Sequence, residues 1–499
     1  MVISTCNQFY SPAQINLYFK SIRKSNKKSS FLNAVNGLRE NSITIGLAAL
    51  SAIYFGYYLS VMNWTSGGGD TYTHFLFAKY AFQHPENFVN HWGKPFFTLF
   101  AAPFAQLGIK GVEAMNIACG ILSGIFAALT AKKLGYQFHF LAVVFTVFAP
   151  VMYNGIFSSL TEPIAALLLI AGVYFYSIKN FRLGSIILSF LILCRTEIFI
   201  FYPLFLVFLW GSKSLKSAPY LAFGFVLYSF IGWPFYDNLL WIITKQPYNP
   251  TSSSYGSGDF WHYADSYDQL IHQLLSVLLL VSILKLPFDL YSKRKQISEV
   301  LKLELLVLAL VVSYFFAHSF VWWMGAGASA GLVRVFMVII PLIALFSLKA
   351  LQWDKVFGNK WVQGVFSVAA IVVMVSVAEH KYDFPVDEDL EILTLRKIDK
   401  EALDKERAGN DLFYYHPFAA IQLDANPNDT LEKRFYFNGG FKSITDVKQG
   451  DIYLWDSHFA ASEGDVSLAL IDSSGFELIQ EHASSWEDHS YTVKAFRKL

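Results

Sequence analysis

Long apolar runs alternate with short polar stretches over residues 41–378. A helix needs about 20 apolar residues to cross the roughly 30 Å hydrocarbon core of a bilayer. By that measure, the pattern predicts eleven membrane-spanning helices near residues 41–62, 112–131, 138–153, 160–178, 183–195, 198–211, 217–236, 268–286, 299–317, 332–349 and 361–378. The runs at 138–153, 183–195 and 198–211 are short for a span, and the last two also fit one broken hairpin. We therefore expect a polytopic all-α membrane bundle.

The pattern changes near Glu379, where charged and polar residues become frequent. The amphipathic, highly charged stretch 387–407 predicts a helix. Short alternating or apolar stretches predict strands at 452–455, 468–471 and 491–496. Turn signals separate them at 438–440, 449–451 and 474–475. We expect three regions, namely a basic N-terminal segment at 1–40, a membrane domain at 41–379 and a small α/β domain at 380–499.

Composition agrees with this division. Only 15% of the 499 residues are charged and 54% are hydrophobic, whereas soluble domains carry about 25% charged residues. Residues 1–379 contain 26 basic against 15 acidic residues, and residues 380–499 contain 13 against 23. No basic stripe lies outside the short loops, which excludes nucleic acid as the principal partner. The three cysteines all precede residue 195, so a disulfide framework in the C-terminal region is excluded.

Basic residues are retained on the cytoplasmic side of a membrane, and this sets the expected orientation. With the N-terminus inside, 20 of the 26 basic residues before position 380 fall in the cytoplasm. The odd number of spans then places the acidic C-terminal domain outside. Two long loops, at 63–111 and 237–267, and a Trp- and Gly-rich loop at 318–331 lie on the same outer face. Because functional residues concentrate in such loops, we expect the active face to be the outer one.

Ionisable groups at membrane depth cost several kcal/mol unless they are paired or hydrated, so each is a functional candidate. Asp70 follows three glycines directly after the first predicted span and can begin a helix. His74 would then lie on the same helical face. Asp70 is either the N-cap of this helix or a catalytic base, and the two roles are compatible.

Other candidates lie at the outer ends of several spans. Lys94, in the sequence His91-Trp92-Gly93-Lys94-Pro95, stands where cytoplasmic retention would disfavour it, so an anionic partner such as a lipid phosphate fits it. Arg195 and Arg334 each have two interpretations: an ion pair, for Arg195 with Glu197, or a fork of donors for phosphate. The remaining outward-facing candidates include Glu162 and His318.

Several other site types lack their sequence signals. The chain has no His-Glu-x-x-His metal pattern, no phosphate-cradling nucleotide loop and no Gly-x-Ser-x-Gly nucleophile elbow. We therefore expect no bound cofactor, with a divalent metal left open.

The order of the motifs resembles the GT-C superfamily of integral membrane glycosyltransferases, especially its mannosyltransferase-like and protein-O-mannosyltransferase-like branch. The resemblance rests on an acid after the first span, followed by Trp-Gly-Lys-Pro at 92–95, Leu-Thr-Glu-Pro at 160–163 and Arg-Thr-Glu at 195–197. It covers about residues 41–350, and the acidic region after it is similar to the extracytoplasmic C-terminal domains that some of these enzymes carry. Many relatives have two adjacent acids in the first loop, whereas Asp70 is followed by Thr71.

The resemblance implies an enzyme that transfers a sugar from a polyprenyl-phosphate carrier to an acceptor hydroxyl on the outer face, with inversion and generally without a metal. It implies that Asp70 is the general base and that Lys94, Arg195 and Arg334 stabilise the leaving phosphate. The other residues expected to bind donor or acceptor are His74, His91, Trp92, Glu162, Glu197 and His318.

The acceptor is a glycan, a lipid or a protein, and the expected location is a bacterial inner membrane with the site facing the periplasm, or the endoplasmic reticulum. The alternatives are an envelope polysaccharide ligase or polymerase, a transporter or flippase of lipid-linked glycans, and a non-enzymatic envelope component.

Overall fold

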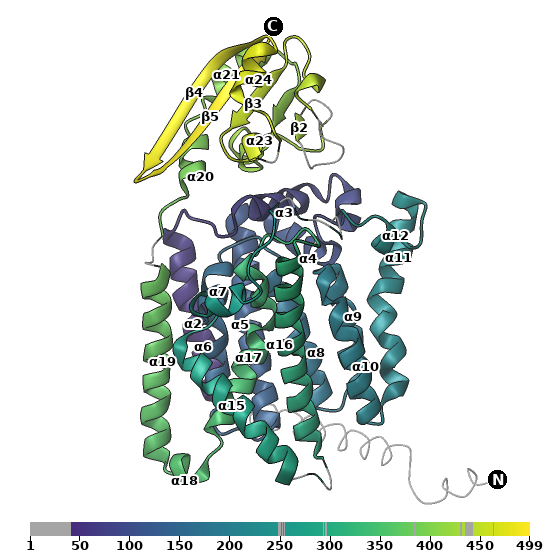
Figure 1. Cartoon of the computed structure of the whole chain (residues 1–499), viewed down its shortest axis with the longest axis vertical. Coiled ribbons are helices and arrows are strands. Elements are labelled where there is room, and N and C mark those ends of the chain that lie inside the picture. The colour runs from purple at the N-terminus through teal and green to yellow at the C-terminus, as the bar shows by residue number, and fades with distance from the viewer. Residues whose placement is uncertain are drawn as a thin grey trace, which may run out of the picture.

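The computed structural model describes residues 41–499 except 248–250, 252, 254, 293, 295–296, 383–385, 430–431, 435–442 and 463. It consists of a helical bundle with a smaller domain at one end (Figure 1). The expected N-terminal segment 1–40 and the turn at 438–440 lie outside the described residues. We call residues 386–499 the tail domain and the end of the bundle next to it the tail-side end.

Among the described residues, seven segments are long and apolar enough to cross a membrane. They are α2 (Ser42–Val61), α5 (Ile109–Lys133), η4–α11 (Leu215–Tyr236), α15 (Gln273–Ser292), α16 (Glu299–Met324), η5–α17–η6 (Val333–Leu351) and α19 (Lys360–Tyr382). Shorter apolar segments accompany them: α4 (Pro95–Ala105), α8 (Glu162–Ser177), α9–η2 (Phe181–Leu193) and η3–α10 (Thr196–Gly211). The chain is an integral membrane protein, and the expected helical bundle is confirmed.

The expected span at 138–153 forms two short helices, α6 (Leu141–Val147) and α7 (Pro150–Gly155). Proline has no backbone N–H to continue a helix, but it fits the first helical turn, so Pro150 ends one helix and begins the next. The remaining short elements are α3 (Gly68–Tyr80), η1 (Pro85–Val89), α12 (Trp241–Thr244), α13 (His262–Asp265), α14 (Tyr267–Leu270) and α18 (Asp354–Phe357). Helix α3 lies across the tail-side end, beneath the tail domain (Figure 1).

The tail domain contains a five-stranded mixed sheet in the order β2-β1-β3-β5-β4. Strands β2 (Glu432–Arg434), β1 (Leu412–Tyr414) and β3 (Ile452–Asp456) are parallel, and β5 (His489–Lys498) pairs antiparallel with β3 and with β4 (Phe476–Trp486). The helices of the tail domain are α20 (Leu390–Leu395), α21 (Lys400–Arg407), α22 (Phe418–Gln422), η7 (Ile444–Asp446), α23 (Phe459–Ser462) and α24 (Leu468–Ser473). The predicted α/β domain is therefore confirmed.

Two local predictions in the tail domain are wrong. The charged stretch 387–407 forms two helices, because the side chain of Asp399 caps a new helix by accepting from the backbone N–H of Ala402. The stretch 468–471 is helix α24 rather than a strand, since the Ser467 side chain accepts from the N–H of Leu470 and starts it. The predicted strands at 452–455 and 491–496 are confirmed as parts of β3 and β5.

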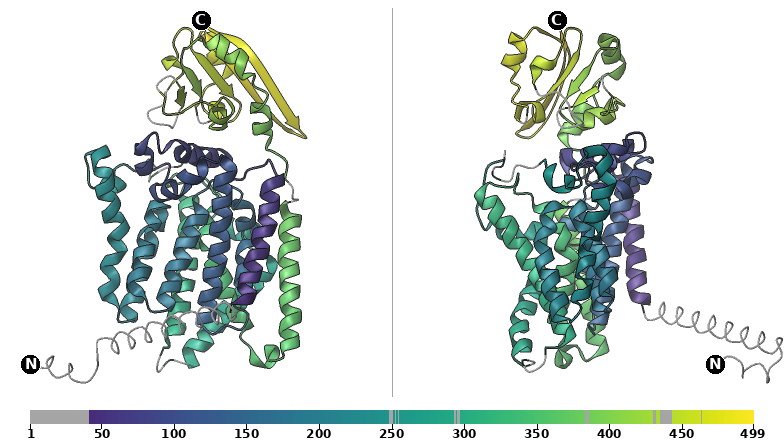
Figure 2. Two further views of the ribbon diagram at one scale, coloured as in Figure 1. Left: turned by 180° about the vertical axis from the view of Figure 1, so that it is seen from behind. Right: turned by 90° about the vertical axis from the view of Figure 1, so that its right-hand side faces the viewer.

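One cluster of buried apolar side chains continues from the bundle into the tail domain. It includes Tyr72 on α3 together with Ile392 and Phe418 of the tail domain. The three views in Figures 1 and 2 show the tail domain on one end of the bundle only. Apolar contact of this kind, rather than the linker alone, holds the tail domain against the bundle.

A buried ionic network ties together the opposite end of the bundle. The ammonium of Lys349, whose residue is 3% exposed, contacts the carboxylates of Asp289 and Glu304, the latter at 2.7 Å. The hydroxyl of Tyr136 donates to the other oxygen of Glu304 at 2.6 Å. The network thus links α15, α16, η6 and the turn after α5.

Replacing Lys349 with alanine should strongly destabilise the bundle, because it leaves Glu304 buried without its cation. Removing one partner of a buried ion pair costs about 3–5 kcal/mol. Lys302→Ala is the matched control, since Lys302 pairs with Glu299 at the surface at 2.7 Å, where a pair contributes about 0–1 kcal/mol. Thermal unfolding in detergent should show a clearly lower midpoint for the Lys349 variant only; equal midpoints would contradict the proposed role of the network.

Candidate active site

The loop between α2 and α3 brings Asp70 to the tail-side end of the bundle. Gly67 has φ +100°, a conformation that residues with a side chain rarely adopt, and it is the N-cap of α3. Asp70 is therefore the third residue of the helix, and the N-cap interpretation of Asp70 is wrong. A Cβ at Gly67 would lie 2.8 Å from Leu160, so the loop is packed directly against the segment before α8.

The carboxylate of Asp70 is bound by Arg334. One guanidinium nitrogen of Arg334 contacts Asp70 and another donates to the carbonyl of Gly67 at 2.7 Å, so this side chain holds both the acid and its loop. Burial opposes ionisation of Asp70, but the nearby positive charge of Arg334 lowers its pKa below the ordinary value. The Asp70 side chain is nevertheless 40% exposed. It is an ionised carboxylate that is partly open to solvent.

Three more charged side chains continue from this pair. Glu162 Oε1 lies 3.9 Å from Arg334 Nε and 2.7 Å from a nitrogen of Arg195. Arg195 Nε in turn donates to Glu197 Oε1 at 2.7 Å. We call these five residues, in the order Asp70, Arg334, Glu162, Arg195 and Glu197, the charge chain. Its signs alternate, and only its middle residue, Glu162, is fully enclosed, at 1% exposed.

Arg195 forms ion pairs with two carboxylates. The predicted ion pair between Arg195 and Glu197 is present, and Glu162 contacts a second nitrogen of the same guanidinium. Tyr314 on α16 also donates a longer hydrogen bond to Glu197, at 3.4 Å. The sequence interpretation missed Tyr314, although it lies four residues before His318 and so on the same helical face.

Lys94 lies in the same electrostatic neighbourhood. It is the N-cap of α4, has φ +58° and is 6% exposed. Burial lowers its pKa to about 8, although the carboxylates of Glu197, Asp70 and Glu162 favour its charged form. With Lys94 included, three carboxylates face three cations, so the formal charge of the group is balanced.

The four other predicted site residues divide into two pairs. His74, one turn after Asp70, and His318 both have a buried ring nitrogen without a hydrogen-bond partner. Burial lowers the pKa of His74 to about 3, so its ring is neutral near pH 7. His91 instead bonds the carbonyl of Trp241 at 3.1 Å, and Trp92 belongs to the turn capped by Asn90. These two residues support the loop and are not part of the charge chain.

Several buried polar atoms in and near the charge chain also have no hydrogen-bond partner within the protein. They include Glu162 Oε2 and Arg334 Nε as well as the two histidine nitrogens. Because buried polar groups are nearly always hydrogen-bonded, such a concentration suits a site that a polar ligand completes. In the described part of the chain, no group of three or more His, Cys, Asp and Glu side chains is placed to share a metal ion.

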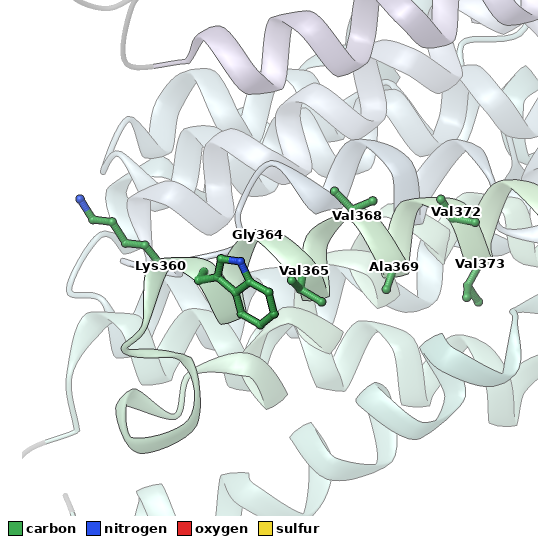
Figure 3. Close-up of a pocket in the computed structure, with 8 residues that line it drawn as sticks. Lys360, Gly364, Val365, Val368, Ala369, Val372 and Val373 are labelled. Atoms are coloured by element: carbon green, nitrogen blue, oxygen red, sulfur yellow. The ribbon is translucent and has the colours of Figure 1, made fainter.

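An apolar hollow elsewhere in the bundle is separate from this site. It has a volume of about 800 Å³ and is lined by α19 between Lys360 and Val373 (Figure 3). Lys360 begins α19 at the end of the bundle remote from the tail domain (Figure 1).

The tail domain covers α3 next to the charge chain. Phe418 packs edge-on against Tyr72, with ring centroids 5.1 Å apart. Asp389 accepts a hydrogen bond from Trp64 Nε1 at 3.3 Å, and the carbonyl of Ala425 accepts one from the hydroxyl of Tyr80 at 3.2 Å. The tail domain therefore packs on α3, the helix that carries Asp70.

Comparison with known proteins identifies the architecture. No family model matches the sequence, and no curated protein matches it. Similar solved structures include the crystal structures of ArnT from Cupriavidus metallidurans bound to undecaprenyl phosphate and in the apo state. The first has a TM-score of 0.57 at 11% identity and covers 91% of this chain and 98% of ArnT. The second has a TM-score of 0.57 at 10% identity over 92% and 98%. At this identity the likeness concerns the fold alone: over nearly its whole length the chain shares the overall fold of ArnT.

Proposed function

We propose that this chain is a membrane glycosyltransferase that moves a sugar from a polyprenyl-phosphate donor to an acceptor hydroxyl on the outer face of the membrane. The observation that carries the proposal is the partly exposed Asp70 carboxylate bound to Arg334 at the tail-side end of the bundle. The fold shared with ArnT, which was crystallised with undecaprenyl phosphate, supports a lipid phosphate as the leaving group. A bacterial inner membrane, with the tail-side end in the periplasm, fits the position of Asp70 and a polyprenyl-phosphate donor.

The proposed reaction needs a base and a cation in the same place. Asp70 takes the proton of the acceptor hydroxyl while the acceptor oxygen attacks the anomeric carbon. The bond from that carbon to the phosphate oxygen breaks, and the electron pair leaves with the lipid phosphate. Arg334 and Lys94 then stabilise the growing negative charge, an electrostatic contribution that is often the largest in an enzyme. Attack from the side opposite the phosphate inverts the anomeric configuration.

Charge balance suggests how the donor prepares the base. The charge chain and Lys94 are already neutral as a group, so an arriving phosphate must compete with a carboxylate for a cation. Arg334 is the cation that can turn to the phosphate more easily. Arg195 is paired with two acids, whereas Arg334 is paired mainly with Asp70. As Arg334 turns toward the phosphate, Asp70 loses its counter-charge. Its pKa then rises and it becomes a better proton acceptor, just when the donor is in place.

Asp70→Asn should abolish transfer and leave the protein folded. The amide cannot accept the proton, and general-base help is worth about 10²–10⁴ in rate. The assay is the acceptor-dependent release of polyprenyl phosphate, measured in proteoliposomes with a panel of polyprenyl-phosphate hexoses and pentoses. Asp424→Asn is the control, because this acid is exposed and lies 3.8 Å from Lys79. Near-normal turnover of the Asp70 variant would remove Asp70 from the role of base.

Arg195 and Arg334 should respond differently to substitution. Arg195→Gln removes the cation that Glu162 and Glu197 share. Breaking a buried ion pair costs about 3–5 kcal/mol, so we expect a lower thermal midpoint. Arg334→Lys keeps a charge beside Asp70 but loses the second donor, so we expect a fall in kcat with little change in the midpoint. A lower kcat with an unchanged midpoint in Arg195→Gln, together with a lower midpoint in Arg334→Lys, would show that Arg195, rather than Arg334, contacts the donor phosphate.

The pKa of Lys94 predicts an alkaline limit to donor use. This ammonium is charged below about pH 8 and loses its proton above it. The KM for the polyprenyl-phosphate donor should therefore rise as the pH passes 8. Lys94→Arg keeps its charge at every accessible pH, so it should move the rise to higher pH. An identical pH profile in the two proteins would exclude Lys94 from phosphate binding.

A further inference from the structure

The three glycines before Asp70 are required for different reasons. Gly67 and Gly68 have φ +100° and +58°, so their backbone conformation favours glycine. Gly69 is not among the glycines with positive φ, and its backbone suits any residue. A Cβ at Gly69, however, would lie 2.7 Å from Cζ of Phe459 in the tail domain. The absence of a side chain next to Asp70 is therefore explained by an aromatic ring from nearly 400 residues further along the chain.

The ring of Phe459 is held firmly within the tail domain. Asp456, at the end of β3, is 2% exposed and accepts from the backbone N–H of Phe459 at 2.6 Å and of His458 at 3.1 Å. The Phe459 ring centroid lies 4.9 Å from that of His416, edge to face, and 4.3 Å from that of His458. Both histidines donate to Glu391, at 3.1 and 2.8 Å. The backbone of Phe459 is therefore tied to the end of β3, and its partly buried ring contacts two histidine rings on the side of the tail domain.

The opposite side of the glycine loop rests on the bundle. The N–H of Ser66 donates to the carbonyl of Phe157 at 2.7 Å, and the N–H of Ser159 donates to Thr71 Oγ1 at 2.6 Å. These bonds bracket Asp70 from both directions along the chain. The start of α3 is thus clamped between the segment before α8 and α23 of the tail domain, which faces α3 (Figure 1).

We propose that Phe459 is a positioning residue for Asp70: by packing on Gly69, it holds the first turn of α3 so that the carboxylate faces Arg334 and the acceptor. The proposal rests on the proposed function of Asp70. A displacement of about 1 Å at a reacting group can lower a rate about 10²-fold, so loss of this contact reduces kcat. Donor KM changes less, because Lys94 is held by α4.

The test is a cycle of full-length variants in the release assay. Gly69→Ala places a methyl group against the ring and should lower kcat by about tenfold to a hundredfold, with donor KM within about threefold of wild type. Phe459→Ala should also lower kcat. The double variant Gly69→Ala/Phe459→Ala removes the clash and should recover part of the activity lost in Gly69→Ala alone.

Phe476→Ala is the matched control. Phe476 packs on the same buried cluster of the tail domain as Phe459, so its loss weakens the domain without touching α3. Its kcat should stay near that of wild type. Normal turnover in Gly69→Ala, no recovery in the double variant, or an equal loss in the Phe476 variant would each overturn the proposal.

Hydrogen exchange separates this proposal from the proposed function. Phe459→Ala should speed amide exchange in a peptide spanning 66–72 and leave peptides from α16 unchanged, while Phe476→Ala should change neither. Unchanged exchange at 66–72 would contradict the positioning role. If wild type releases no polyprenyl phosphate from any donor tested, the glycosyltransferase proposal fails, whereas the exchange result still decides whether Phe459 holds the loop.

Discussion

The buried carboxylate of Glu162 must be neutralised by nearby cations, and this requirement determines how the charged side chains at the tail-side end are arranged. Glu162 lies between Arg195 and Arg334, and these two arginines reach outward to Glu197 and Asp70. An ionised group in this setting is costly unless an opposite charge meets it, so each member stabilises its neighbours. The five side chains come from four separate stretches of sequence, around residues 70, 162, 195–197 and 334. Their mutual attraction thus fixes how those segments meet.

The order of these charges also separates structural from chemical roles. Arg195 contacts two carboxylates and Glu162 contacts two guanidiniums, and these ion pairs hold the arrangement together. In the proposed reaction the chemical roles belong to Asp70 and Arg334, whose side chains are 40% and 22% exposed. A site of this kind stays assembled without a ligand and still offers a carboxylate and a guanidinium to one. The tail domain adds a second restraint, since it contacts α3 at several points along its length.

Much of the fold followed from simple patterns. Apolar runs of about 20 residues predict spans because backbone groups in lipid must be bonded within a helix, and isolated charges at the ends of spans indicated Asp70, Arg195 and Arg334 as candidates. The stretch at 468–471 was misread because its apolar run is too short to distinguish helix from strand, and the cap at Ser467 decides it.

Contacts between segments far apart in the chain could not be predicted from the sequence. The second acid on Arg195 and the hydrogen bond from Tyr314 depend on helix packing. The same holds for the position of Phe459 over Gly69, which no spacing in the sequence reveals. The hydrogen bond between the His91 ring and the carbonyl of Trp241, 150 residues away, is another contact of this kind.

A structure of the full chain with a bound polyprenyl phosphate tests the central claim most directly. We expect the phosphate at the tail-side end, within hydrogen-bond distance of Arg334 and Lys94, with the Asp70 carboxylate released from Arg334. A phosphate bound elsewhere, such as beside Lys360 at the far end of α19, with the Asp70–Arg334 pair intact, would contradict it.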